Sequence, residues 1–186
     1  ALHDSFRYTQ ASYPASDWPS LNVGMALREE AMHRNVTARF AEAGSGAKAV
    51  LMSHNLHLAK DFDRIKGNFG AGPGGGRVTA IGTYLNRMLS ADIFSVWMLC
   101  NRGRDCQPFS FCTCDIKPVE GSLNSILSEI GPALILPLSS SAAAPIPTLL
   151  NSKMLIQMDG QPGVRAAIAD QADAIFFIDE VSPLRA

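Results

Sequence analysis

The residues with the clearest potential for chemistry are His54, Asn55 and His57, which follow a short apolar run. That run, residues 49–52 (AVLM), is typical of a short buried strand. In open α/β sheets, ligands bind just beyond the carboxyl ends of the strands. Two imidazoles at such a position can exchange protons with water near neutral pH. The pattern predicts a functional site, and ordinary loop histidines are the alternative reading.

The same histidines also suggest a domain that binds a metal or a small ligand without catalysis. Asp61 or Glu29 would then supply a carboxylate beside His54 and His57, since two imidazoles and a carboxylate can bind a divalent ion. The spacing of the two histidines does not force them to converge on a metal. Our prediction is therefore a site without a metal or a cofactor, and the metal site stays as the alternative.

The composition indicates a folded domain. The chain has 186 residues, of which 47% are hydrophobic and 18% are charged. The net charge of -1 gives no reason to expect nucleic acid or an anionic membrane as a partner. No apolar run is long enough to span a bilayer, and the first residues do not resemble a signal peptide. A cytoplasmic protein is the expectation.

The four cysteines fall within residues 100–114 as C-x5-C-x5-C-x-C. This is not a usual zinc-binding spacing, and no histidine lies nearby in the sequence. Free thiols are expected, and a disulfide such as Cys106–Cys112 stays open if the compartment is oxidising.

Periodicity and turn residues predict helices and strands in alternation. We expect an extended entry segment at residues 1–19 and a single α/β domain at residues 20–186. The predicted helices are 21–43, 78–89 and 123–130, and the predicted strands are 48–53, 92–100, 108–113, 133–138, 155–158 and 174–181. This alternation favours a mostly parallel sheet flanked by helices.

Residues 66–77 form a glycine-rich stretch after the candidate site. The Gly-Lys-Ser/Thr of a P-loop is absent, so a phosphate-binding loop is disfavoured. Glycine-rich composition mainly signals flexibility, and a loop in this position would suit a mobile lid.

Four stretches in one order resemble the erythromycin esterase family. Residues 28–35 (REEAMHRN) look like its R-[DE]-x-x-M-x-x-N helix, and residues 48–58 (KAVLMSHNLHL) are similar to its strand running into W-x-H-N-x-H. Residues 81–85 (IGTYL) resemble its M-G-x-x-L helix start, and residues 173–179 (DAIFFID) resemble its D-A-[VI]-[IF]-F-I-D strand. The match runs from about residue 17 to residue 185.

The resemblance implies an α/β fold with a hydrolase site that cleaves an ester or a lactone such as a macrolide. Cleavage of a macrolide would confer antibiotic resistance. The resemblance implies that His54 and His57 are catalytic residues that activate water. It also implies that Asn55 orients them and that Arg28 and Glu29 line the cleft. No G-x-S-x-G motif is present, so a serine hydrolase is disfavoured.

The sequence lacks the family's G-E-x-x-H-G stretch, which belongs to its N-terminal half and supplies a His and a Glu to the site. The chain therefore resembles the C-terminal half of the pattern, and an incomplete version of the fold is expected. A fragment, a chain that pairs with another, and an inactive protein all remain open. A sheet without its partner strands would also favour self-association.

Overall fold

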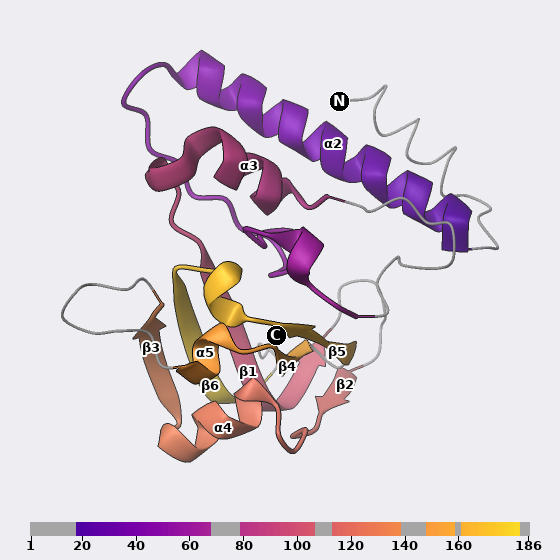
Figure 1. Cartoon of the computed structure of the whole chain (residues 1–186), viewed down its shortest axis with the longest axis vertical. Coiled ribbons are helices and arrows are strands. Elements are labelled where there is room, and N and C mark those ends of the chain that lie inside the picture. Colours follow the sequence, from indigo (N-terminus) through magenta and orange to yellow (C-terminus); the bar gives the residue numbers. More distant parts are fainter. Residues whose placement is uncertain (1–17, 68–78, 107–112, 139–147, 159–160, 183–186) are drawn as a thin grey trace. The chain divides into compact units, whose positions relative to one another are not determined.

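A computed structural model describes residues 18–67, 79–106, 113–138, 148–158 and 161–182 (Figure 1). The chain divides into two compact units. The histidine unit comprises Ala1–Asp63 and Phe69–Ile93, and the sheet unit comprises Arg64–Asn68 and Phe94–Ala186. Most of the predicted entry segment and of the glycine-rich loop lies outside the described residues, and the single domain stays a prediction.

The histidine unit is built on two helices, α2 (Trp18–Ala43) and α3 (Ile81–Leu89), which pack side by side (Figure 1). His33 of α2 stacks on Tyr84 of α3, with ring centroids 4.6 Å apart. One turn further on, the Thr37 hydroxyl lies 4.0 Å from the Met88 sulfur. The predicted helices 21–43 and 78–89 are confirmed, with shifted starts. Two short 3-10 turns, η1 (Phe62–Arg64) and η2 (Ser90–Asp92), follow the histidine loop and α3.

The strand predicted at residues 48–53 does not form, so that prediction is wrong. Val50 is 90% exposed and Met52 is 85% exposed. A strand needs a neighbour to satisfy its backbone N–H and C=O groups. No segment among the described residues pairs with this one, so the apolar run stays in solvent.

The sheet unit has a four-stranded sheet in the order β2-β1-β6-β3 and a two-stranded sheet, β4-β5. Its strands are β1 (Val96–Cys106), β2 (Thr113–Ile116), β3 (Ala133–Pro137), β4 (Met154–Met158), β5 (Gln161–Ala166) and β6 (Ala174–Val181). Its helices are α4 (Leu123–Ile130), α5 (Thr148–Asn151) and the 3-10 turn η3 (Ile168–Asp170). None of the helices among the described residues is both long and apolar enough to cross a membrane.

The α/β fold class is confirmed, but the strand directions differ from the mostly parallel sheet that was predicted. β1 and β6 run parallel, whereas β1–β2 and β3–β6 are antiparallel pairs. Only residues 107–112 connect β1 to β2. That connection is too short for a crossover helix, and it therefore requires an antiparallel pair.

Helix α4 covers one face of the larger sheet (Figure 1). Trp97 of β1 and Phe177 of β6 are fully buried on that face. Asn124 of α4 adds a polar link, because its side chain donates to the Cys100 carbonyl at 2.7 Å and accepts the Gln157 N–H at 2.9 Å. Burial and these bonds together fix α4 on the sheet.

The other face of the sheet is apolar and exposed. Met98, Phe176 and Ile135 lie side by side in the strand register, and we call this row the open face. Met98 is 58% exposed and Ile135 is 71% exposed. Where one face of a largely antiparallel sheet meets water, that face normally carries polar residues, whereas this row is apolar. The open face is thus an apolar surface that the described part of the chain leaves exposed.

β5 is not among the strands predicted from the sequence; it contains Pro162 and Gly163, residue types that are depleted in strands. A Cβ at Gly163 would lie 2.6 Å from the Ile156 carbonyl oxygen, so the glycine allows close approach of two strands. Cys100 forms no disulfide, while the side chains involved in the predicted Cys106–Cys112 alternative lie outside the described residues.

Candidate active site

The centre of the histidine unit is a buried carboxylate that binds a histidine. Glu29 of α2 is only 2% exposed. Its Oε1 lies 2.5 Å from Nδ1 of His57, and its Oε2 accepts the Ile81 N–H at 2.9 Å. Burying a carboxylate is costly unless donors replace its water. Here two donors do so, and one belongs to a helix N-terminus, where negative charge is favoured.

The first turn of α3 holds this arrangement. Its N-cap residue, Ala80, offers no side-chain cap, so the first N–H groups of the helix need other acceptors. Ile81 donates to Glu29, and Gly82 donates to the carbonyl of His57 at 2.7 Å. One helix start therefore binds both the carboxylate and the histidine that meet in the site.

The histidines lie in a tight turn that brings their rings together. The His57 N–H donates to the His54 carbonyl at 2.9 Å, and the Leu58 N–H donates to the Asn55 carbonyl at 3.0 Å. The two imidazoles meet edge to face, with centroids 6.4 Å apart. The Leu56 N–H donates to Nδ1 of His54 at 3.3 Å, so the His54 ring is also held by the turn.

These bonds place the ring proton on different nitrogens in the two histidines. Because Nδ1 of His57 faces a carboxylate, its proton belongs there, and Nε2 keeps a lone pair that can act as a base. Because Nδ1 of His54 accepts a backbone N–H, the neutral ring carries its proton on Nε2 and can donate it in a hydrogen bond. A base and a donor side by side are suited to hydrolysis.

Of the residues predicted for the site, the structure brings together Glu29, His57 and His54. The His57 side chain is 20% exposed, and His54 is an exposed residue. Arg28 is exposed on α2, about 100° around the helix from Glu29. Asn55 is half-buried in the turn. The roles given to Arg28 and Asn55 stay predictions.

Sequence reasoning missed the part of α3 that holds the histidines. Its signal was the glycine in the second position of the helix. A Cβ at Gly82 would lie 2.5 Å from the carbonyl oxygen of Leu58, which belongs to the histidine turn. A glycine there permits the N–H of residue 82 to reach His57, so the glycine marks a close contact between helix and turn.

The metal-binding alternative gains no support from the described part of the chain. Within it, no group of three or more His, Cys, Asp or Glu side chains is arranged to hold a metal ion. Asp61, which was considered as a carboxylate ligand, is half-buried beyond the turn.

The model of the erythromycin esterase family matches residues 1–181. The chain belongs to the erythromycin esterase family. The family assignment that the four sequence stretches suggested is therefore confirmed. No curated protein sequence matches the chain.

Solved structures share the fold at low sequence identity. A succinoglycan biosynthesis protein matches with a TM-score of 0.64 and 19% identity, over 91% of this chain and 41% of that one. A Bacillus cereus protein matches with a TM-score of 0.64 and 16% identity, over 92% and 41%. A mutant erythromycin esterase in its open conformation matches with a TM-score of 0.53 and 16% identity, over 84% and 38%. The chain thus spans less than half the length of these proteins.

Proposed function

We propose that this chain forms the part of an erythromycin esterase-like hydrolase in which His57 activates water for attack on an ester or a lactone. The observation that carries the proposal is the contact between the buried Glu29 carboxylate and Nδ1 of His57. A carboxylate bound to one ring nitrogen leaves the other nitrogen as the base, which is the arrangement of a catalytic His–acid pair.

In the proposed reaction, Nε2 of His57 takes a proton from water as the water oxygen attacks the carbonyl carbon. Glu29 stabilises the imidazolium that forms. His54 donates from Nε2 toward the carbonyl oxygen, where negative charge develops. The C–O bond then breaks, and the proton on His57 passes to the leaving oxygen. The products are a carboxylic acid and an alcohol, or a hydroxy acid where the substrate is a lactone.

The proposed substrates are small esters and lactones, including macrolides. Opening a macrolide lactone by hydrolysis would inactivate the antibiotic and confer resistance. In this proposal Arg28 and Asn55 bind or orient the substrate beside the two histidines, and the reaction requires no metal or other cofactor.

The test is hydrolysis of a panel of activated esters and a macrolide by the whole chain. We expect His57→Ala to lower turnover at least about a hundredfold, since removal of a general base typically costs ~10²–10⁴ in rate. His54→Ala should also lower turnover. His33→Ala is the matched control, because His33 lies in the same unit and stacks on Tyr84 outside the pair. Equal turnover in all variants, or none from a folded wild-type chain, would contradict the proposal.

We also propose that further polypeptide covers the open face, either a second copy or the portion of the fold that the longer structures contain. The support is the exposure of Met98 and Ile135 on a sheet whose other side buries Trp97 and Phe177. An apolar surface of this kind usually marks an interaction site.

The isolated chain is therefore expected to self-associate through the open face. Ile135→Glu should shift the chain to monomer, because it places a charge in the middle of the contact. Ile130→Glu is the control, since Ile130 lies in α4, away from the open-face row, and is 70% exposed, almost as much as Ile135 at 71%. Sedimentation velocity measures the difference. If the wild type is monomeric, or if both substitutions act alike, the open face is not the contact.

A further inference from the structure

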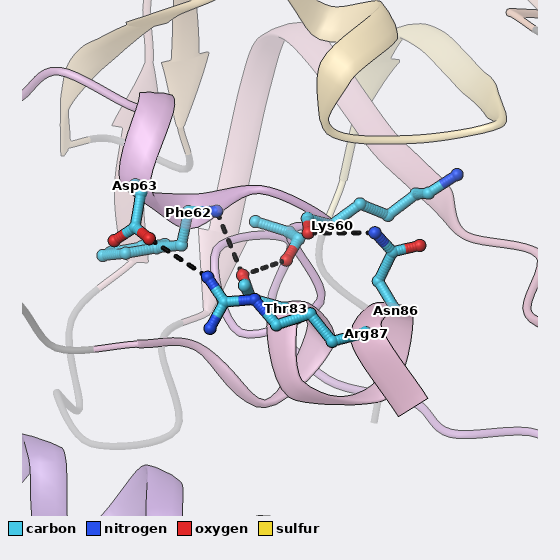
Figure 2. Close-up of polar contacts among 7 residues, drawn as sticks. Lys60, Phe62, Asp63, Thr83, Asn86 and Arg87 are labelled. Carbon is cyan, nitrogen blue, oxygen red and sulfur yellow. Dashed lines mark hydrogen bonds and ion pairs between the residues drawn. The ribbon is translucent and has the colours of Figure 1, made fainter. Parts of the chain in front are cut away.

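Thr83 of α3 makes two hydrogen bonds to the segment that follows the histidine turn. Its hydroxyl donates to the Ala59 carbonyl at 2.9 Å and accepts the Phe62 N–H at 3.0 Å (Figure 2). Thr83 is 1% exposed, and Ala59 is fully buried. If the hydroxyl is lost, the Ala59 carbonyl is left buried without this partner, and the Phe62 N–H loses the bond that holds it against α3.

The same face of α3 contacts this segment twice more. Asn86 donates from its side chain to the Lys60 carbonyl at 3.4 Å, and Arg87 pairs with Asp63 at 3.2 Å (Figure 2). Positions three and four residues after Thr83 lie on one side of the helix. The three side chains thus form a row along residues 59–63, and the buried Thr83 makes the shortest of these bonds.

We propose that Thr83 is a positioning residue for His57. This inference rests on the proposed function, because it assigns Thr83 a part in the same site. The first turn of α3 binds Glu29 through Ile81 and the His57 carbonyl through Gly82. Thr83 completes the set by fixing the chain just beyond His57. Ile81, Gly82 and Thr83, three successive helix residues, then fix the distance between the Glu29 carboxylate and the His57 ring.

Only a side chain that both donates and accepts can fill this place. A hydroxyl has one donor and two acceptor sites, so threonine and serine satisfy Ala59 and Phe62 together. Valine has the shape of threonine without either function. The substitutions Thr83→Val and Thr83→Ser therefore separate the hydrogen bonds from the packing.

The experiment measures kcat, KM and the His57 Nδ1–H signal by NMR in the whole chain. For Thr83→Val we expect kcat to fall about tenfold to a hundredfold with little change in KM, since small misplacements of catalytic groups cost rate. The Nδ1–H signal should weaken or disappear. Thr83→Ser should restore both. The control is Thr37→Val, because the Thr37 hydroxyl faces the Met88 sulfur at 4.0 Å and not the histidine turn; both readings should stay unchanged.

The two measurements, kcat and the His57 Nδ1–H signal, distinguish a failure of this inference from a failure of the proposed function. A folded Thr83→Val chain with the wild-type kcat and the wild-type Nδ1–H signal would overturn the inference and leave the hydrolase proposal standing. If the wild type hydrolyses nothing, the NMR signal decides alone: its loss in Thr83→Val and return in Thr83→Ser support positioning, and an unchanged signal overturns it. Should Thr83→Val not fold, Asn86→Ala loosens the same segment, and a smaller change in the same direction is expected. Wild-type behaviour would then overturn the inference.

Discussion

Replacing Glu29 with glutamine should reduce ester hydrolysis by ~10²–10⁴ in kcat, because the amide disturbs the proton position on His57. Oε1 and Oε2 of Glu29 both act as acceptors, one for His57 and one for Ile81. Glutamine has only one oxygen. Its NH₂ group must face one of the two donors, and when it faces Nδ1 it favours the ring form with the proton on Nε2. That form has no basic nitrogen directed at the substrate. Steady-state kinetics on an activated ester measures the loss.

The matched control for this prediction is Glu30→Gln. Glu30 is the next residue of the same helix, and it is exposed and paired with Arg34 at 3.0 Å. An exposed pair of this kind contributes little, so kinetics and stability should stay close to the wild type. The double variant Glu29→Gln, His57→Gln should be hardly slower than His57→Gln alone, because the two residues act as a unit. Additive losses would show that Glu29 acts independently of His57.

Replacing Gly82 with alanine should lower the free energy of unfolding by about 3 kcal/mol or more, as expected for a forced backbone shift. The new Cβ would meet backbone atoms of Leu58, including its carbonyl oxygen at 2.5 Å. Backbone cannot rotate away as a flexible side chain can. Either α3 or the histidine turn must move, and hydrolysis should fall with stability. Urea denaturation followed by circular dichroism gives the size of the effect.

Gly131→Ala provides the comparison for Gly82→Ala. A Cβ at Gly131 would meet nothing within 4 Å, and the φ of 171° is extended backbone that any residue adopts. A change within about 0.5 kcal/mol is expected. A similar loss in both variants would mean that the contact between Gly82 and Leu58 has no special role.

Local signals in the sequence were sufficient to predict the limits of some helices and strands. α4 matches its predicted limits because Ser122 caps it, with its side chain accepting the Ser125 N–H at 3.1 Å, and Gly131 ends it. β6 matches because its apolar run is long and bounded by polar residues. Each of these boundaries depends on residues within one turn or one strand, which is the range over which sequence patterns act.

The rest depended on contacts between distant residues. In the sequence, Glu29 is one of three successive charged residues, Arg28 to Glu30, and nothing local distinguishes it. Glu29 is buried because α3 packs against α2 at this point. Residues 48–53 have the pattern of a strand, yet a strand forms only where a partner exists. The family resemblance implied that His57 and Glu29 are site residues, but it gave no sign that they touch or that Thr83 contacts the segment after the histidine turn.

The most direct test of the central claim is the proton position on His57 in the wild-type chain. Nitrogen NMR of histidine-labelled protein distinguishes the two neutral forms of the imidazole. We predict a proton on Nδ1, held by Glu29, and a bare Nε2; in Glu29→Gln the proton should move toward Nε2. A wild-type His57 with its proton on Nε2 would contradict the account, because the nitrogen assigned as the base would then have no lone pair to receive a proton.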